Sequence, residues 1–316
     1  MSKQPLVTIV LQTYNRRRML EDALKSAREQ TYKNIEILIG DNCSEDDTEN
    51  FCTEQTKTDS RIKYFRHSEN IGMVGNANFL LDRVSGEYFI FLNDDDWLDS
   101  DYVEKCINYI IDKPDYSMVC PSTVLYQNRY ADDKVASVKK CHITRLNSNN
   151  IIKRLTNYLI NQDELEMSSG CFRTSVLKLI KKTEGQYIRD RYNEDIVLEM
   201  KFLAAGKCKM LYKTHMNKRD GGYSREVNSS NNVYAANNIN LKNVTHKRCK
   251  IFAKAIFKDK FFAQVLGNIK SKNLAMQIYF ILARHYARGI YKPMILYYRI
   301  KNSLILSWNF FRLFKI

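Results

Sequence analysis

Four short apolar runs alternate with helix-like segments in the first hundred residues, and this alternation limits the fold more than any other feature. The runs are LVTIVL at 6–11, IEILI at 35–39, IKYF at 62–65 and YFIFL at 88–92. Continuous apolar runs of this length are typical of strands that are buried on both faces of a sheet. Strands that alternate with helices form βαβ units, whose strands run parallel. We therefore expect an α/β domain with a mostly parallel sheet flanked by helices.

Polar clusters follow these runs closely. Thr13-Tyr14-Asn15 follow the first run, Asp41-Asn42 the second and Asn93-Asp94-Asp95-Asp96 the fourth. In open α/β sheets, ligands bind outside the carboxyl ends of the strands, so the three clusters should meet at one edge and form a binding site. Neither GxGxxG nor GxxxxGK[ST] occurs in the chain. Neither a dinucleotide-binding domain nor a P-loop is therefore supported.

Three consecutive aspartates, residues 94–96, directly follow a strand pattern. Crowded carboxylates cost free energy unless a positive charge lies between them. Their hard oxygens suit Mg²⁺ or Mn²⁺, and these ions bridge phosphate oxygens. The alternative is capping of the next helix, because acids near a first turn are favoured by the helix dipole. Capping accounts for Asp99 and Asp101 but not for three acids that abut the strand.

Longer stretches carry a resemblance to a known family. They are LVTIVLQTYNR, LEDALKSAREQTYKNIEILIGDNCSEDDT, RIKYFRHSENIGMVGNAN and VSGEYFIFLNDDDWL, nearly continuous over 5–100, followed later by SSGCF and NEDIVLEMKFLAAG. In order and spacing they resemble glycosyltransferase family 2, whose members have the Rossmann-like GT-A fold and invert the anomeric centre. The resemblance implies a transferase that moves a hexose from a nucleotide sugar, a UDP-sugar, to an acceptor hydroxyl.

The resemblance also implies roles for individual residues. Asp95 matches the metal-binding acid of the family's DxD motif, and the implied metal is Mn²⁺ or Mg²⁺. Asp96 and His215 are further candidate metal ligands. The candidate nucleotide-sugar contacts are Thr13, Tyr14, Asn15, Asp41, Asn70, Gly72, Asn78, Asn93, Asp94 and Arg219. Among them, Asp41 is expected to accept a hydrogen bond from the ring N–H of uracil.

The chain departs from the family pattern at two positions. Asn93 stands where the family has the first acid of DxD; its amide oxygen can still serve as a ligand, and Asp94 or Asp96 can supply the missing charge. Ala77 stands where many relatives have an arginine directed at the diphosphate, and Arg66 is the candidate substitute. These departures leave an alternative open, a non-catalytic nucleotide-sugar-binding or membrane scaffold protein with a degenerate site.

Glu194-Asp195 opens a helix-like segment and resembles the family's ED motif, whose aspartate is the general base. An acceptor hydroxyl must lose its proton as it attacks the anomeric carbon. One base suffices for a single in-line displacement, which inverts that centre, whereas retaining hydrolysis needs two close carboxylates. The alternative is that Asp195 only caps its helix. Ser169 and Gly170 match positions near the sugar, and HMNKRDGGYSR resembles a flexible loop that closes over the donor.

The positive charge is confined to the last quarter of the chain. Residues 242–316 contain sixteen Lys and Arg residues against one acid, whereas residues 1–241 contain 34 of each sign. We therefore divide the chain into a catalytic domain, 1–241, and a basic helical appendage, 242–316. Aromatic residues at helical spacing in the appendage favour amphipathic helices on an anionic membrane surface. Packing against the sheet is the alternative, and no nucleic acid is expected as a partner.

Other features bear on the cellular compartment. The eight cysteines lack CxxC spacing, the N-terminus lacks a signal-peptide pattern, and no apolar run has a membrane-spanning length of about 18 residues. We expect reduced thiols, a cytoplasmic location and peripheral binding to the inner face of the cell membrane. The expected acceptor is a lipid-linked bacterial surface glycan, such as O-antigen or capsule. Oligomerisation is left open.

Overall fold

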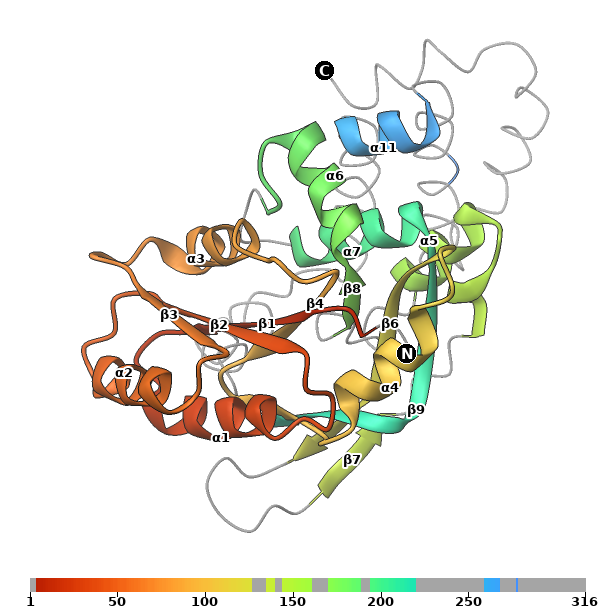
Figure 1. Cartoon of the computed structure of the whole chain (residues 1–316). Coiled ribbons are helices and arrows are strands. Elements are labelled where there is room, and N and C mark those ends of the chain that lie inside the picture. The colour runs from red at the N-terminus through yellow and green to blue at the C-terminus, as the bar shows by residue number, and fades with distance from the viewer. Residues whose placement is uncertain are drawn as a thin grey trace, which may run out of the picture.

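The computed structural model describes residues 4–126, 135–139, 144–160, 170–188, 194–219, 259–267 and 277. Strands and helices alternate through most of this part of the chain (Figure 1). In chain order the elements are β1 (Val7–Thr13), α1 (Arg17–Arg28), β2 (Ile35–Asp41), α2 (Thr48–Thr58), β3 (Ile62–Arg66), α3 (Gly72–Leu81), β4 (Tyr88–Asn93), β5 (Asp96–Leu98), α4 (Tyr102–Ile110), β6 (Tyr116–Tyr126), β7 (Val135–Lys139), a 3-10 helix (Thr144–Asn147), α5 (Ile151–Ile160), β8 (Cys171–Arg173), α6 (Thr174–Glu184), α7 (Glu194–Ala205), β9 (Lys207–Arg219) and α11 (Lys260–Leu266).

The strands form one sheet in the order β3-β2-β1-β4-β8-β6-β9-β5, with β7 paired to β6. The four predicted runs are β1 to β4, and they pair in parallel. Beyond β4 the sheet is mixed, because β8 runs antiparallel to both of its neighbours while β9 runs parallel to β6. The predicted α/β fold is confirmed, and its parallel part is the half that begins the chain.

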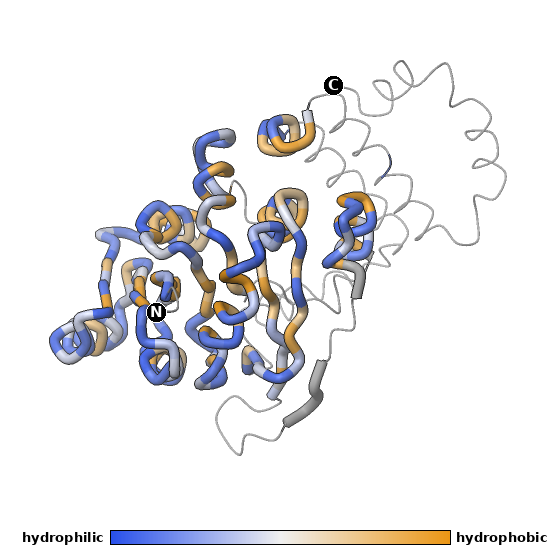
Figure 2. Tube along the Cα trace, turned by 45° about the vertical axis from the view of Figure 1, so that its right-hand side comes forward, coloured by the Kyte–Doolittle hydropathy of each residue, from blue (hydrophilic) through white to orange (hydrophobic). Residues whose placement is uncertain are grey.

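Two hydrophobic cores lie on opposite faces of the sheet. Successive side chains of a strand point to opposite faces, so Ile9 and Leu11 of β1 join the core under α1 and α4, whereas Val10 joins the core under α3, α6 and α7. Figure 1 shows α1 and α2 on one side of the strands and α3, α6 and α7 on the other. In Figure 2 the central strands carry apolar segments, and the helices alternate between apolar and polar residues.

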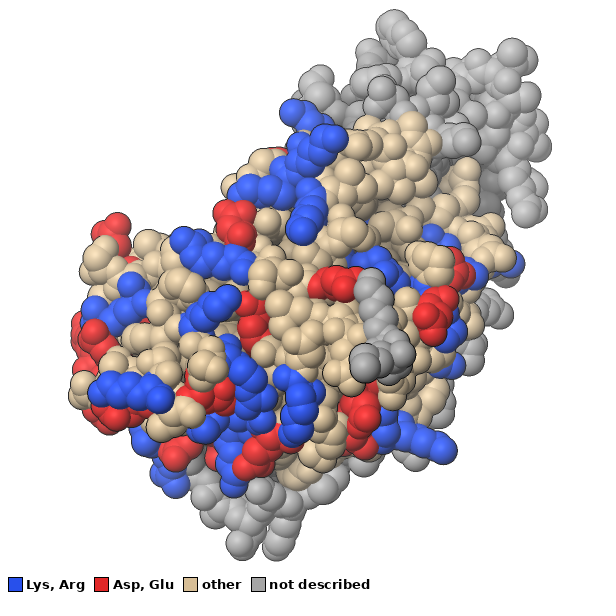
Figure 3. Space-filling model, viewed as in Figure 1, with Lys and Arg blue, Asp and Glu red and all other residues tan. Residues whose placement is uncertain are grey.

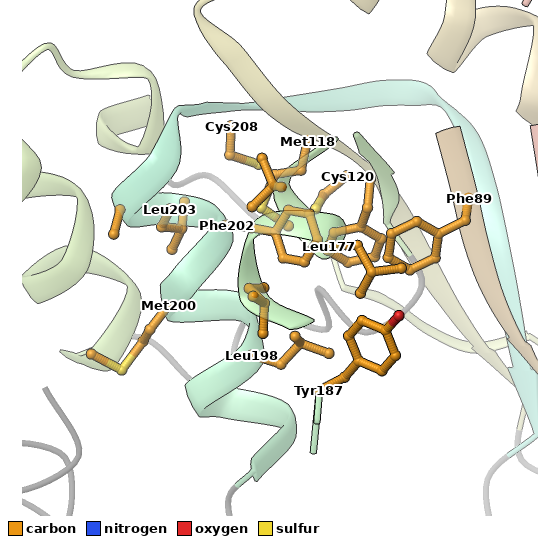
Figure 4. Packing of buried hydrophobic residues seen from close by; sticks show 14 of the residues in the cluster. Phe89, Met118, Cys120, Leu177, Tyr187, Leu198, Met200, Phe202, Leu203 and Cys208 are labelled. Atoms are coloured by element: carbon orange, nitrogen blue, oxygen red, sulfur yellow. The ribbon is translucent and has the colours of Figure 1, made fainter. Parts of the chain in front are cut away.

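Aromatic rings fill the core under α7 (Figure 4). The rings of Phe89 and Phe172 stack with their centroids 5.2 Å apart, and Phe202 of α7 lies 4.8 Å from Phe172. Aromatic pairs at such separations stabilise a core beyond the area they bury. These contacts attach α7, the helix that begins at Glu194, to β4 and β8 of the sheet.

The first described helix of the basic appendage belongs to this same core. Phe261 and Phe262 of α11 are fully buried, and the helix packs against α6 and α7 (Figure 1). Just before it, Asp259 caps the helix by accepting a hydrogen bond from the backbone N–H of Phe261. Asp259 also forms a buried ion pair with Lys201 of α7, with Nζ and Oδ2 2.8 Å apart. These two phenylalanines therefore face the protein and not a membrane, and the change in composition at 241/242 does not end the core.

Helix α5 packs apolar residues such as Leu155 and Leu159 against the α7 core. One further segment differs from the sequence-based expectation. Residues 207–219 form a strand, β9, where a flexible loop was expected over its last part.

Among the described residues, no helix combines the length and apolarity needed to cross a membrane. The face seen in Figure 3 mixes both signs of charge over α1 and α2, in line with the balanced charge of residues 1–241.

Candidate active site

The carboxyl ends of the parallel strands bring the predicted polar clusters together. Thr13 at the end of β1 lies beside Asp41 at the end of β2, and Asp41 lies beside Arg66 at the end of β3. On the other side of β1, Gln12 pairs with Asn93 at the end of β4. The prediction that these clusters share one edge of the sheet is therefore confirmed.

A single arginine lies between two of the three aspartates. The Nη1 atom of Arg16 is 3.2 Å from Asp94 Oδ1 and 3.2 Å from Asp95 Oδ2. Burial raises the pKa of Asp94 to about 6; Arg16 lowers it and the neighbouring charge of Asp95 raises it. One guanidinium thus only partly offsets the crowded charge. Sequence reasoning missed Arg16, although it directly follows the polar cluster after β1.

The third aspartate is directed elsewhere. Asp96 begins β5 and accepts a hydrogen bond from Asn93 Nδ2 through Oδ2 at 2.9 Å. The same oxygen lies 3.8 Å from Lys218 Nζ, on the neighbouring position of β9. Asn93 and Asp96 therefore hold each other across the turn, and Asp94 and Asp95 are the pair that converges.

This pair fits a divalent metal. Two carboxylate oxygens already meet around one positive atom, and hard oxygens are the ligands that Mg²⁺ and Mn²⁺ prefer. In the described ranges, three or more acidic, His or Cys side chains do not gather into a ready metal cage. Mg²⁺ is usually bound by one or two carboxylates together with substrate phosphates and waters. The chain's own contribution to such a site would therefore be Asp94 and Asp95.

The structure does not bring His215 to this pair. His215 lies in β9, where its Nδ1 is 2.9 Å from Asp99 Oδ2 and its backbone N–H donates to the same oxygen. It stands three positions from Lys218, the residue opposite Asp96, which corresponds to about 10 Å along a strand. Asp99 also accepts from Asn217, so its carboxylate binds β9 and does not cap a helix. His215 and Asp99 together fasten β9 to the start of α4.

The loops after β1 and β2 are fastened to each other. Asn15 adopts a left-handed conformation with φ of 52°, its Oδ1 accepts from Glu45 N, and its own N–H donates to Ser44 Oγ. Asp41 is completely buried, and its oxygens accept from Ser44 N and Tyr64 Oη. Asp41 therefore supports the loop, and its carboxylate is not open to a uracil ring in this structure. Tyr14, by contrast, is 41% exposed at the edge.

The residues predicted to form a nucleotide-binding loop and helix start, Asn70, Gly72 and Asn78, have two different structural roles. Asn70 Oδ1 accepts from Asn42 Nδ2 and from the N–H of Gly72, whose φ is 77°, so the loop is held to the end of β2. Asn78, further along α3, accepts from the N–H groups of Tyr187 and Ile188 and donates to Ile188 O. Its amide therefore fixes residues 187–188, a few positions before α7, and does not face the aspartate pair.

The two residues singled out for the diphosphate also have protein partners. Ala77 is buried, as expected of a small residue on the inner side of α3. Arg66 Nε lies 3.1 Å from Glu49 Oε2, and its Nη2 donates to Ser44 O at 3.0 Å. Arg66 is thus held beside the loop after β2, on a strand that β2 and β1 separate from β4.

The helix of the expected general base begins where predicted, at Glu194. The side chains of Glu194 and Asp195, together with Ser169 and the segment after Arg219, lie outside the described residues, whereas Gly170 is buried. Farther along α7, Tyr158 of α5 donates to Glu199, and Arg154 Nε donates to Leu203 O at 2.8 Å. These buried contacts hold α7 to α5.

Arg219 ends β9 and is tied to two neighbours. Its guanidinium lies 4.9 Å from the ring centroid of Trp97, a cation–π distance, and it forms an ion pair with Asp22 of α1. Arg219 therefore links the end of β9 to β5 and α1, and its charge is already shared with an acid.

Sequence comparisons point to one family. Residues 8–180 match the family model of Glycosyl transferase family 2. The GalNAc(5)-diNAcBac-PP-undecaprenol beta-1,3-glucosyltransferase of Campylobacter jejuni is 42% identical over 95 residues, 30% of this chain and 31% of that protein. The putative teichuronic acid biosynthesis glycosyltransferase TuaG of Bacillus subtilis is 33% identical over 110 residues, 35% of this chain and 44% of that protein. The matches span less than half the length of these relatives.

Solved structures agree with the fold. TarS 1-349 of S. aureus in complex with UDP-GlcNAc has a TM-score of 0.58 at 15% identity and covers 94% of this chain and 76% of its own. The mannosyltransferase PcManGT from Pyrobaculum calidifontis, in complex with GDP-Man and Mn²⁺, has a TM-score of 0.55 at 14% identity. The match covers 99% of this chain and 84% of that protein. At such identities the likeness shows a shared fold alone. The family model matches more than half of this chain, and the chain therefore belongs to glycosyl transferase family 2.

Proposed function

We propose that the protein is a metal-dependent, inverting glycosyltransferase that moves a hexose from a UDP-sugar to an acceptor hydroxyl. The observation that carries the proposal is the convergence of Asp94 Oδ1 and Asp95 Oδ2 on one cationic nitrogen at the carboxyl edge of the sheet. Two neighbours in fold support the ligands: TarS was solved with UDP-GlcNAc and PcManGT with Mn²⁺. The family assignment supports the class of reaction.

The residues divide the chemistry between them. Asp94 and Asp95 hold the metal, which when bound would offset the charge that develops on the departing diphosphate. Asp195, at the start of α7, takes the proton from the acceptor hydroxyl. A single displacement by that hydroxyl inverts the anomeric centre. The exposed ring of Tyr14 lies at the same edge and offers a face to the donor.

The proposed acceptor is a lipid-linked bacterial surface glycan. The Campylobacter relative is named for an undecaprenol-PP-linked substrate, and TuaG for teichuronic acid biosynthesis. The basic, aromatic appendage would bring the protein to the membrane where such a glycan is presented.

A sugar-nucleotide panel tests the proposed reaction. The purified chain is incubated with UDP- and GDP-sugars, with and without Mn²⁺, and release of the nucleoside diphosphate is measured. We expect metal-dependent release from a UDP-sugar, and NMR of a transfer product should show the inverted anomer. Asp195→Asn should abolish transfer, whereas Asp112→Asn, at an exposed acid after α4, should leave it unchanged. No metal-dependent release from any donor, with transfer indifferent to Asp195→Asn, would favour a non-catalytic binding protein.

A truncation tests the membrane role. Because Phe261 and Phe262 belong to the core, the chain is shortened after Gly267 so that α11 is kept. The truncated protein should retain its melting temperature and lose binding to anionic liposomes. Binding equal to that of the full chain would count against a membrane function of the appendage.

A further inference from the structure

Arg16 occupies a fixed position beside the aspartate pair. It is the residue that precedes α1, and its carbonyl accepts hydrogen bonds from Met19 N and Leu20 N, both at 3.0 Å. Its side chain is 18% exposed, against 8% for Asp94 and 13% for Asp95. Ion pairs so shielded from water are stronger than those at an open surface. Arg16 is therefore part of the site's construction and not a mobile surface group.

A divalent metal held by Asp94 and Asp95 would compete with Arg16 for the same two carboxylates. The Nη1 atom already lies between Asp94 Oδ1 and Asp95 Oδ2. A metal bound to these oxygens would bring two further positive charges against the guanidinium, and like charges at such distances repel strongly. A metal bound in this way would therefore displace Arg16 from the oxygens that it now holds.

A diphosphate supplies a new partner for the displaced guanidinium. Helix α3 contains no arginine, and Arg66 is engaged by Glu49 and by the loop after β2. The planar guanidinium of arginine matches phosphate oxygens through two parallel hydrogen bonds. The guanidinium of Arg16 lies directly beside Asp94 and Asp95, so an anion that bridges a metal held by this pair would lie near it.

We propose that Arg16 changes partners during donor binding. In the metal-free protein it holds Asp94 and Asp95 together; when the metal binds, it moves to the diphosphate of the donor and serves as the arginine that α3 lacks. The inference rests on the function proposed above, which brings a metal and a nucleotide to this edge. Arg16 is a binding residue in this scheme, and the proton transfer is left to Asp195.

Arg16→Ala tests the exchange because it should shift two affinities in opposite directions. Without nucleotide, Mn²⁺ binding followed by electron paramagnetic resonance should become about fivefold tighter, because the competing cation is gone. In saturating Mn²⁺, UDP binding followed by calorimetry should weaken by about 10- to 100-fold, the loss expected for hydrogen bonds to a charged group. Arg16→Lys should keep Mn²⁺ binding near the wild-type value and recover part of the UDP affinity.

A matched control variant shows whether the effects are specific to Arg16. Arg18→Ala removes the same charge from an exposed position two residues away and should change neither affinity by more than about twofold. If Arg16→Ala weakens Mn²⁺ binding, or leaves UDP binding unchanged while the wild type binds both ligands, the exchange is overturned. A wild-type chain that binds neither Mn²⁺ nor UDP would instead overturn the proposed function. Circular dichroism of each variant shows that the fold is kept.

Discussion

Two buried carboxylate sites lie at opposite ends of the same sheet. At the amino end of β2, Glu36 Oε1 accepts hydrogen bonds from Thr8 Oγ1 and Ser85 Oγ, both at 2.5 Å, and from Ser85 N at 3.1 Å. Its other oxygen pairs with Lys63 Nζ at 2.8 Å. Burial raises the pKa of Glu36, but the donors from Lys63, Ser85 and Thr8 outweigh burial, and the pKa is lowered.

The carboxyl end of the sheet has the opposite balance. Asp94 and Asp95 share one guanidinium, and burial raises the pKa of Asp94 to about 6 although Arg16 lowers it. A carboxylate with several donors is part of the framework, because its charge is already compensated where it lies. A pair whose charge is only partly compensated still attracts a cation. The difference separates an acid that stabilises the fold from acids that bind.

Asp95→Asn gives the largest expected effect on this comparison. The variant loses one charge from the metal site, so metal-dependent transfer should fall by about 10³-fold, in the range for loss of a group that stabilises transition-state charge. The melting temperature should stay nearly the same, because the lost repulsion with Asp94 offsets the lost ion pair with Arg16. Steady-state kinetics and thermal unfolding measure the two quantities. A variant with a lower melting temperature and unchanged turnover would show that Asp95, like Glu36, stabilises the fold and does not bind the metal.

Lys201→Ala extends the comparison to a carboxylate enclosed on all sides. Lys201 and Asp259 are 2% and 5% exposed, so removal of the lysine leaves a buried charge without its partner. Breaking such a pair costs about 3–5 kcal/mol, whereas replacing both members with apolar residues is often nearly neutral. Urea denaturation should therefore show a large loss for Lys201→Ala and a partial recovery for the double variant Lys201→Met/Asp259→Leu, which also loses the cap on α11. Equal losses in the single and double variants would contradict a pure charge effect.

The parallel half of the fold was predictable from the sequence because its signals are local. Each of the runs at 6–11, 35–39, 62–65 and 88–92 is mostly apolar, and strands in the interior of a parallel sheet typically show that pattern. The other half depends on pairing between distant segments. The polar run at the end of β9 resembles a loop in isolation, but its side chains bind Asp96 and Asp99, which lie more than a hundred residues earlier.

The sequence was enough to predict the acids of the candidate site but not the arginine that lies between them. Asp94 and Asp95 follow an apolar strand, which is a strong local signal, whereas residues 16–18 are three consecutive arginines. Which of them faces the acids depends on where α1 begins. Arg16 precedes the helix and turns to the aspartates, while Arg17 lies in the first turn and pairs with Glu21. The sequence of letters holds no sign of this difference.

Glu36→Gln tests the framework end with a smaller effect. The substitution removes the charge that Lys63 and three hydrogen-bond donors compensate, but Lys63 is 53% exposed and its pairing is screened by water. We expect a loss of about 2 kcal/mol in the free energy of unfolding. Glu54→Gln, which breaks the exposed pair with Lys57, should cost less than about 0.5 kcal/mol. Turnover per folded molecule should be unchanged. A loss of turnover would contradict the distinction between a stabilising acid at the amino end of the sheet and binding acids at its carboxyl end.

The pH dependence of the same variant gives the smallest and most specific effect. Because the pKa of Glu36 is lowered from 4.5 on folding, the stability that its charge contributes is present above that pH and is lost as pH falls through the folded value. The difference in unfolding free energy between wild type and Glu36→Gln should therefore be constant from about pH 7 to pH 5.5 and shrink below about pH 4.5. Urea denaturation at a series of pH values measures it. A difference that grows toward acid pH would mean that Glu36 is protonated in the native state, and the contrast with Asp94 would be lost.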